Sequence, residues 1–499
     1  MTSAGLVVAV VGAYLAACLA VGTLPGRKSS ASAVGYVAGD RALGLVLMYF
    51  ITGATIFSAF AFLGLPGWAY RRGVAALYIL GYGALGFVPF YFLGPRAARL
   101  GRRHGFVTQA EMVAHRFQMP ALAGVMAAIS TLAFVPYLAL QMKGAGLVLN
   151  VVTRGAVAEW LGAAVVYAVV LAYVWKSGVL GVGWTNVFQG VFMLALAWVL
   201  GLWLPYRLYG GVGAMFERIA ETRPELLVPP GLASGGELAW TWGEYSSAVI
   251  VSIVGFSCWP HLFMKAFSAR DARTLQRTVV LYPTFQVFLL PILLIGFAGV
   301  LFQPAPPVPD QILPHILMNL ELPGLVVGLF CAGAVAASMS SGDAIAHASA
   351  SILVRDGWVT ALGRRLGQRE ERTAIRFVVL AVMAGAYVLA IQFEGTLVNL
   401  LLYAYGPIAQ LMPALLATLY WSGATGPGVL AGLVGGSAVS VLFAVSPELR
   451  PFLLHEGIYG LAANVVLLVL VSALTRGRPD PRETDFMVVA SRTDPLVPG

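Results

Sequence analysis

The sequence of 499 residues is poor in charge, and this shortage excludes most soluble folds. Only 11% of the residues are Asp, Glu, Lys or Arg, whereas 59% are hydrophobic, and the mean hydropathy is +0.83. A soluble chain of this length could not bury so much apolar surface. The composition therefore indicates an all-α, polytopic membrane protein whose bilayer-facing helices satisfy their own backbone hydrogen bonds.

Cysteine is scarce, and an early basic residue is absent. The three cysteines, Cys18, Cys258 and Cys331, stand in apolar runs without metal-type spacing, so we expect core side chains and no disulfide. No Lys or Arg precedes Arg27, whereas a secretory signal needs a basic start. We therefore expect the first apolar segment to be retained, with the N-terminus outside because its positive charges follow it.

Sequence motifs of enzymes are missing as well. The chain has no nucleotide-binding P-loop, no His/Glu cluster of metal type and no nucleophile elbow. We expect no enzymatic activity, no organic cofactor and no nucleic-acid partner, and any uptake would draw on an ion gradient. The net charge of +9 is typical of basic cytoplasmic loops in a membrane protein.

Apolar segments fill most of the chain. Since a span needs about 20 apolar residues, the sequence predicts about 13 transmembrane helices in one domain over residues 1–475. They cover residues 5–24, 44–70, 74–94, 120–150, 157–175, 180–205, 244–268, 279–302, 324–354, 376–393, 395–421, 427–445 and 457–475. The polar remainder, 476–499, is predicted to be a disordered tail.

Basic residues are distributed unevenly between the two sets of loops. With the N-terminus outside, the loops assigned to the inside hold most of the 31 Lys and Arg. This asymmetry predicts a cytoplasmic C-terminus in the plasma membrane. Arg71 and Arg72 fall on the outer side, against the trend. We expect the monomer to be the functional unit in the lipid bilayer.

Two predicted spans are interrupted. Span 44–70 contains Gly-Ala-Thr from Gly53 near its middle, and span 244–268 contains Gly255 followed by Pro260. Glycine and proline weaken a helix, and the freed backbone groups must face protein, water or a ligand. Either break alone could be an ordinary kink. Paired breaks in spans of opposite direction indicate the binding site of an inverted-repeat transporter.

One apolar helix carries a polar stripe. In "AASMSSGDAIAHASASILVRD", Ser340, Asp343, His347 and Ser351 fall within about 80° on a helical wheel. A carboxylate facing lipid would cost about 2.5–3.5 kcal/mol, so this face should turn toward an ion or water path. Asp343 and His347 could pair, either as a satisfied hydrogen bond or as a proton carrier.

Four stretches together resemble the sodium:solute symporter family. They are "YVAGDRALGLVLMYFITGATIFSAFAFLGLPGWAY", "GFVTQAEMVAHRF", "SGVLGVGWTNVFQGVFM" and "AASMSSGD", and the resemblance covers about residues 5–475. It implies a LeuT-type fold of two inverted five-helix repeats, about 44–205 and 244–421, whose first and sixth core helices are discontinuous. It also implies a sodium-coupled symporter that imports a small organic solute by alternating access.

The resemblance further implies an ion site between core helices one and eight. Sodium prefers oxygen ligands, which unwound backbone and hydroxyls supply. The implied ligands are the carbonyls of Ala54, Phe57 and Ala337 and the hydroxyls of Ser340 and Ser341, with Ser58 as a nearby helper. From the residues alone, these serines could instead bond to their own helix or permit close packing.

Asn186 departs from the family pattern. The fifth core helix of the family often carries Asp in a "WTD"-like motif associated with ion coupling or a second sodium, and this chain has "WTN". A neutral amide cannot supply the negative charge, so we expect one sodium per solute. Ile56 likewise replaces an Asp that one branch of the family carries.

The solute is expected beside the two breaks. The candidate residues are Thr55, Gln141, Lys143, Phe256, Trp259 and His261. Lys143 would pair with an anionic group of the solute, or its ammonium would extend to the interface. The run "VPYLALQ" resembles a segment of monocarboxylate carriers, so a monocarboxylate or amino acid is favoured over a sugar.

Two alternative functions stay open. A proton-coupled transporter of the same fold would use Asp343 and His347, and its uptake would need only a pH gradient. A membrane sensor that kept the fold would normally carry a signalling domain, and residues 476–499 are too few to form one.

Overall fold

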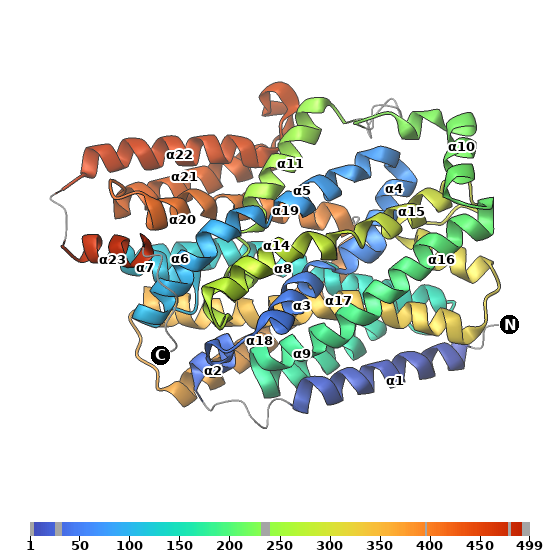
Figure 1. Cartoon of the computed structure of the whole chain (residues 1–499), viewed down its shortest axis with the longest axis horizontal. Helices are drawn as coiled ribbons and strands as arrows, with labels where there is room; N and C mark the ends of the chain where they lie inside the picture. The colour runs from blue at the N-terminus through green and yellow to red at the C-terminus, as the bar shows by residue number, and fades with distance from the viewer. Residues whose placement is uncertain (1–3, 25–31, 231–239, 395–396, 478–480, 492–499) are drawn as a thin grey trace.

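The computed structural model describes residues 4–24, 32–230, 240–394, 397–477 and 481–491. The regular structure of these residues is helical, apart from one isolated parallel bridge between Leu43 and Ala269. Most of the longer helices follow the long axis of the molecule, and α1 begins at the end opposite to α23 (Figure 1). The prediction of an all-helical protein is confirmed.

The helices follow one another in chain order. They are α1 (Ala4–Thr23), α2 (Ala33–Ala38), α3 (Leu45–Ile56), α4 (Leu65–Arg72), α5 (Tyr78–Leu85), α6 (Val88–His104), α7 (Gln109–Arg116), α8 (Pro120–Val152), α9 (Glu159–Tyr209), α10 (Val212–Thr222), α11 (Trp242–Phe256), α12 (Pro260–Phe263), α13 (Lys265–Ser268), α14 (Ala272–Gln286), α15 (Leu289–Gly299), α16 (Ile312–Asn319), α17 (Gly324–Ile352), α18 (Gln368–Gln392), α19 (Leu397–Ala409), α20 (Leu411–Tyr420), α21 (Gly426–Val445), α22 (Glu456–Thr475) and α23 (Pro481–Ser491). Two wider, π-type turns, η3 (Phe60–Gly64) and η8 (Leu353–Ala361), precede α4 and follow α17. Short 3₁₀ turns are η2 (Gly39–Arg41), η4 (Gly73–Leu77), η5 (Pro224–Leu227), η7 (Pro309–Gln311), η9 (Pro447–Leu449) and η10 (Pro451–Leu453).

The number of spans differs from the predicted count. In the described residues, nine helical stretches are long and apolar enough to cross a membrane, or ten if Trp242–Phe256 and Pro260–Ser268, bent by 43°, form one span. The count of about 13 is therefore not confirmed. One cause is α9, whose 51 residues merge two predicted spans.

Gly178 marks the junction between those two predicted spans. Its φ of +55° and ψ of −142° interrupt α9, and a Cβ there would lie 2.4 Å from the Tyr36 carbonyl oxygen. Only glycine tolerates both this backbone and this close approach. The chain therefore changes direction inside α9 without a loop, which a hydropathy count cannot detect.

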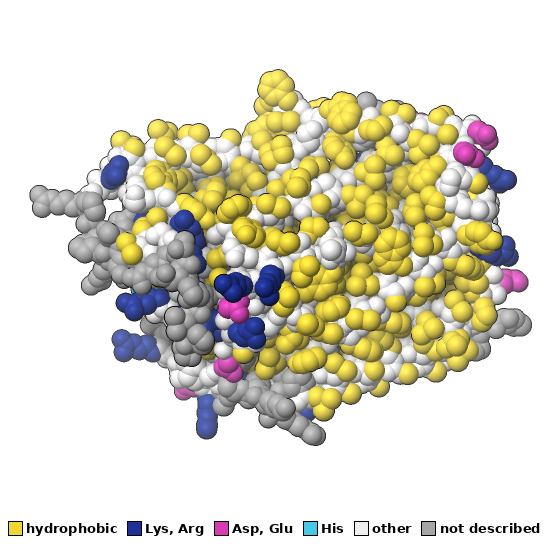
Figure 2. Space-filling view, in the orientation of Figure 1, with side chains coloured by type: hydrophobic (Ala, Val, Ile, Leu, Met, Phe, Trp, Pro, Cys, Tyr) yellow, Lys and Arg dark blue, Asp and Glu magenta, His cyan; other side chains and the backbone are white. Residues whose placement is uncertain are grey.

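α17, which carries the polar stripe, lies in the middle of the bundle. It packs against α1, α8, α9 and α18, and every residue from 330 to 352 is buried. Peripheral helices such as α1 and α22 expose apolar side chains instead, and apolar atoms cover most of the face seen in Figure 2. A polar stripe on a central helix must therefore be satisfied by its helical neighbours.

Basic side chains gather at one end of the bundle, where α6 ends and α7 and α23 lie (Figure 2). We call this the arginine-rich end, and we call the end where α4 terminates and α17 begins the opposite end. At the arginine-rich end, α23 packs on α6 with Phe486 and Ala490 buried, and Arg99 Nη2 donates to the Ala490 carbonyl at 3.1 Å. Residues 481–491 of the predicted disordered tail thus form a short helix that buries these two apolar side chains.

Candidate functional site

The first interrupted helix breaks between α3 and η3. Phe57 leaves helical geometry with ψ of 83°, and the Ser58 N–H donates to the Ile56 carbonyl at 3.0 Å instead of the Ala54 carbonyl that a continued helix would use. The Ala59 N–H donates to Gln141 Oε1 on α8 at 2.8 Å. A side chain of a neighbouring helix thus satisfies the backbone amide that follows the break.

The break, at Phe57, lies two residues beyond the predicted Gly-Ala-Thr. Gly53 is inside α3, and a Cβ there would lie 2.4 Å from the ring of Phe285. This glycine therefore permits close packing and does not end the helix. The position of the break is set by the Phe57 backbone and by Gln141.

The two neighbouring serines of α17 face the broken end of α3. Ser340 Oγ donates to the carbonyl oxygens of Phe57, at 3.2 Å, and Ala337, at 3.1 Å. Ser341 Oγ donates to the Thr55 carbonyl at 2.6 Å, and both serines are fully buried. Five oxygen atoms from two helices thus gather at the break.

Most of the predicted ion ligands meet here. The carbonyls of Phe57 and Ala337 share the Ser340 hydroxyl, and Ser341 joins through Thr55, which was predicted as a solute residue. Ala54 is buried in α3 one residue before Thr55. Neutral oxygens of this kind suit a sodium ion. When the ion binds, the serine hydrogen bonds would break and the same oxygen atoms would coordinate the ion.

Tyr137 on α8 lies between this oxygen cluster and the second break. Its hydroxyl is beside the hydroxyls of Ser58 and Ser341, and its ring centroid is 5.1 Å from that of Trp259. The sequence analysis did not identify Tyr137. Its place one helical turn before Gln141 was the available signal, since residues four apart share a helix face.

The carboxylate of Asp343 is held by side chains of α9. It accepts from Tyr173 Oη at 2.7 Å, Thr185 Oγ1 at 3.2 Å and Asn186 Nδ2 at 3.4 Å. His347 has a different neighbour, since its Nε2 lies 3.0 Å from the Tyr36 carbonyl on α2. Asp343 and His347, which could have paired with each other, thus each have partners on another helix.

The second interrupted helix breaks between α11 and α12, as predicted. Pro260 begins α12 after a bend, and the freed Cys258 carbonyl accepts from Gln109 Nε2 on α7 at 3.1 Å. Ser257 Oγ donates to the Gly86 carbonyl at 2.6 Å. The polar groups of this break are therefore satisfied mainly within the protein.

A small cavity lies between the two breaks. Of the predicted solute residues, Phe256, Trp259 and His261 line it, and Phe57 joins them from the ion cluster. Its volume open to water is about 30 Å³, whereas one ordered water needs about 10–15 Å³ on this measure. The cavity therefore has room for about two waters, and a solute would have to widen it.

Three predicted solute residues lie outside the described lining of this cavity. Thr55 Oγ1 donates within its own helix to Ile51, and Gln141 supports the first break. Lys143 Nζ donates to the Phe393 carbonyl and lies 5.4 Å from the centroid of its ring. The expected partner of Lys143, an anionic solute, is thus replaced by the backbone and ring of a distant helix end.

A buried lysine that the sequence analysis missed lies near the cavity. Lys265, one turn beyond His261, is 4% exposed and interacts electrostatically with His261, His347 and Asp343. Its position directly after the second break was the signal that could have found it.

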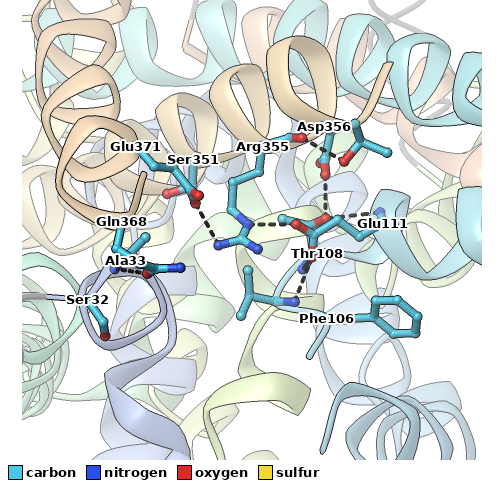
Figure 3. Close-up of polar contacts among 12 residues, drawn as sticks. Ser32, Ala33, Phe106, Thr108, Glu111, Ser351, Arg355, Asp356, Gln368 and Glu371 are labelled. Atoms are coloured by element: carbon cyan, nitrogen blue, oxygen red, sulfur yellow. Dashed lines mark hydrogen bonds and ion pairs between the residues drawn. The ribbon is translucent and has the colours of Figure 1, made fainter. Parts of the chain in front are cut away.

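An ionic network holds the arginine-rich end together (Figure 3). Arg355 on η8 bonds Glu111 Oε1 of α7 through Nε at 2.6 Å and Glu371 Oε1 of α18 through Nη1 at 2.7 Å. Beside it, Thr108 Oγ1 donates to Asp356 Oδ1 at 2.5 Å. These contacts fix α7, which carries Gln109, to the ends of two other helices.

Comparisons with known proteins agree on one class. The sequence model of the sodium:solute symporter family matches residues 36–436. The uncharacterized symporter YhjB of Bacillus subtilis is 29% identical over 88% of this chain and 91% of its own length, and the high-affinity proline transporter PutP of that bacterium is 26% identical over 92% and 96%.

A solved structure shares the fold over nearly the whole chain. A Na⁺-coupled sialic acid symporter in a substrate-bound, outward-open state matches with a TM-score of 0.77 at 19% identity, covering 95% of this chain and 99% of that one. This match confirms the LeuT-type fold that the resemblance implied.

Proposed function

The chain belongs to the sodium:solute symporter family, and on this premise we propose that sodium binds at the first break and drives import of a small organic solute through the cavity between the breaks. As a member of this family it is a multi-pass membrane transporter and not an enzyme. The proposed ligands are the carbonyls of Ala54, Phe57 and Ala337 with the hydroxyls of Ser340 and Ser341.

The observation that carries this proposal is that Phe57 contributes both to the oxygen cluster and to the cavity wall. Its carbonyl belongs to the oxygen cluster, while its ring lines the cavity and packs on Phe285 and Phe288 at centroid distances of 4.9 and 4.2 Å. A sodium ion that fixes the carbonyl also fixes the ring. Binding of ion and solute is then coupled, and each raises the affinity for the other by the same factor.

Asn186 and Asp343 support a single sodium. The Asp343 carboxylate already accepts from three donors, and Asn186 Nδ2 also bonds the Val182 carbonyl at 2.7 Å. The negative charge near the first break is thus held by fixed neutral groups. In our proposal these bonds keep the carboxylate from coordinating a second ion.

We further propose that the arginine-rich end faces the cytoplasm, as the charge asymmetry predicts. The protein would then lie in the plasma membrane with α1 beginning outside and α23 inside, and one chain would suffice for transport, since both breaks and the cavity belong to one bundle. Tagging each end and labelling intact cells would test this orientation.

The decisive experiment measures solute uptake by proteoliposomes with an imposed sodium gradient, an imposed proton gradient, or neither. We expect uptake with sodium alone. Replacing Ser340→Ala and Ser341→Ala together should raise the half-saturating sodium concentration about tenfold or more, the equivalent of about 1.4 kcal/mol. Ser349→Ala is the matched control, because the hydroxyl of this buried serine donates within the same helix, to the Ile345 carbonyl at 2.7 Å.

Two outcomes would contradict the proposal. Unchanged sodium dependence in the double serine variant would reject the ion site. Uptake driven by a pH gradient without sodium would instead favour the proton-coupled alternative, in which Asp343 and His347 act separately.

A further inference from the structure

The cavity has walls of two kinds, and the larger part is apolar. Phe57, Phe60 and Phe256 line it together with Ile79 and Leu289. None of the described residues that line the cavity is Asp, Glu, Lys or Arg. The ammonium group of an amino acid would therefore find no acidic partner there, only neutral oxygens such as those of Gln286 and Tyr405, and burying a charge without a counter-charge is costly.

Next to the cavity and the proposed sodium site lies a polar corner, of which Tyr137 and His261 belong to the cavity lining and Ser58 and Gln141 do not. His261 Nδ1 and Gln141 Nε2 are buried and have no hydrogen-bond partner in the described part of the chain. The hydroxyls of Tyr137 and Ser58 lie beside each other, and the Tyr137 ring centroid is 6.2 Å from that of His261. Buried polar groups are normally paired, so unpaired groups beside a cavity indicate a missing ligand.

The side chains of this polar corner can each donate a hydrogen bond to one group. An amide NH₂, two hydroxyls and an imidazole protonated at Nδ1 all donate, and an ionised carboxylate is purely an acceptor with room for about four hydrogen bonds. The hydroxyls can also accept, but an amide or alcohol group of the solute offers fewer acceptor sites than a carboxylate does. The chemistry of the corner therefore favours a carboxylate.

The buried charges near the corner also favour an anion. The carboxylate of Asp343 and the ammonium of Lys265 offset each other, and they interact electrostatically. A bound sodium ion then leaves one positive charge in a region without bulk water. A monovalent anion makes the occupied site neutral, whereas a zwitterion or a neutral solute does not.

Building on the proposed symport function, we propose that the solute is a monocarboxylate with an apolar or aromatic body. Its carboxylate binds at Tyr137 and His261 in the cavity lining and, once the cavity has widened, at Ser58 and Gln141 beside them, and its body fills the aromatic part of the cavity. Lys265 acts through the electrostatic field as the cation that selects an anion. This role was expected of Lys143, which the structure places against Phe393 instead.

The test compares solutes that share a carbon body and differ in the polar groups attached to it. Purified wild-type protein in proteoliposomes is given straight-chain, branched and aromatic monocarboxylates, the primary amide of each, and amino acids with the same carbon bodies, with and without sodium. We expect sodium-dependent uptake of at least one carboxylate and about tenfold or weaker competition by its amide, which corresponds to about 1.4 kcal/mol.

Two lysine variants assign the selectivity to a residue. Lys265→Met should abolish the preference for carboxylate over amide, Lys265→Arg should retain part of it, and Lys143→Met should leave it unchanged. Lys143 is the matched control because it is the other lysine within a predicted span and lies outside the cavity lining. If Lys265→Met fails to fold, the wild-type comparison of acids with amides still decides the proposal.

The outcomes separate this inference from the function on which it rests. Sodium-driven uptake of amides or amino acids, but of no carboxylate, would overturn the solute class and leave the symport intact. If no compound is taken up while sodium alone still stabilises the protein against heat, the carboxylate class is again wrong. Carboxylate uptake that ignores sodium would overturn the symport proposal.

Discussion

The two interrupted helices are supported by the same type of side chain used in opposite senses. At the first break, Gln141 Oε1 accepts from the Ala59 N–H, whereas at the second break Gln109 Nε2 donates to the Cys258 carbonyl. A glutamine carries both an acceptor and a donor, so either use is open to it. The difference decides which backbone groups each break leaves for a ligand.

The first break leaves carbonyl oxygens available, because its glutamine satisfies an amide. Serine hydroxyls of α17 occupy these oxygens, and a sodium ion can replace those hydroxyl hydrogens. The second break has its freed carbonyl bonded by Gln109, and Pro260 has no amide hydrogen to satisfy. It contributes aromatic walls and His261 instead. One break is thus suited to an ion and the other to a solute.

The largest expected effect is a loss of stability at the second break when Arg355 is replaced. Arg355→Met would leave Glu111 and Glu371 without their cation in a setting that is mostly buried, at a cost of about 3–5 kcal/mol. Because Glu111 and Gln109 share α7, hydrogen exchange measured by mass spectrometry should increase at residues 256–263 and not at residues 56–64.

Two controls sharpen this expectation. Arg355→Lys keeps the charge but loses the planar fork, so it should lie between wild type and Arg355→Met. Arg369→Met removes an exposed arginine of α18 and should leave the exchange of both breaks unchanged. Equal exchange at the two breaks in Arg355→Met would show that the ionic network does not support the second break in particular.

The next effect concerns the first break and depends on pH. Asp310, in the turn η7 at the opposite end, packs against Gly67 beyond the first break and accepts from the Leu397 N–H at 3.0 Å. Burial raises the pKa of Asp310 from 3.8 to about 6, and the Leu397 N–H, Lys143 and Arg71 offset part of this rise. The folded protein therefore holds a proton that the unfolded chain releases between about pH 4 and 6.

Asp310→Asn should remove this pH dependence. In the wild type, the contribution of Asp310 to stability falls by about 3 kcal/mol as the pH rises through that window. The asparagine keeps an oxygen for the Leu397 N–H and carries no charge to bury, so the variant should match the wild type near pH 4 and exceed it above pH 6. Melting temperatures of both proteins in detergent across this range provide the measurement, and parallel curves would contradict the assignment.

The sequence predicted the polar parts of the ion cluster better than the solute cavity. Ser340 lies on the polar stripe that local helical periodicity predicts, and the family motif covers both Ser340 and Ser341. The first break was placed at Gly53, since a sequence shows where a helix is weak and not which side chain replaces its hydrogen bonds. That information lies in Gln141 on another helix.

Long-range neighbours explain the other differences. Lys143 looked like a solute ligand because its residue type is rare in a membrane, but its partner Phe393 is 250 residues away. The network of Glu111, Arg355 and Glu371 joins three segments that no local pattern connects. Lys265 and Tyr137 lie in short stretches without a recognisable motif. Their importance depends on which interrupted helix packs beside them, and the sequence does not show that packing.

The smallest expected effect tests directly whether Gln141 accepts a hydrogen bond while Gln109 donates one. Methionine is close to glutamine in size and has neither donor nor acceptor of comparable strength, so Gln141→Met and Gln109→Met should each cost about 1–3 kcal/mol. Glutamate separates the two positions, because an ionised carboxylate can accept but cannot donate. Gln141→Glu keeps the bond from the Ala59 N–H, whereas Gln109→Glu directs an oxygen at the Cys258 carbonyl.

Both glutamates carry the cost of a buried charge, so the difference between them isolates the direction of the hydrogen bond. We expect Gln109→Glu to be less stable than Gln141→Glu by about 1–2 kcal/mol, the worth of one bond kept and one lost. Thermal unfolding at neutral pH measures this difference. The reverse order would mean that the breaks are not held by these side chains, and the separation into an ion break and a solute break would lose its structural basis.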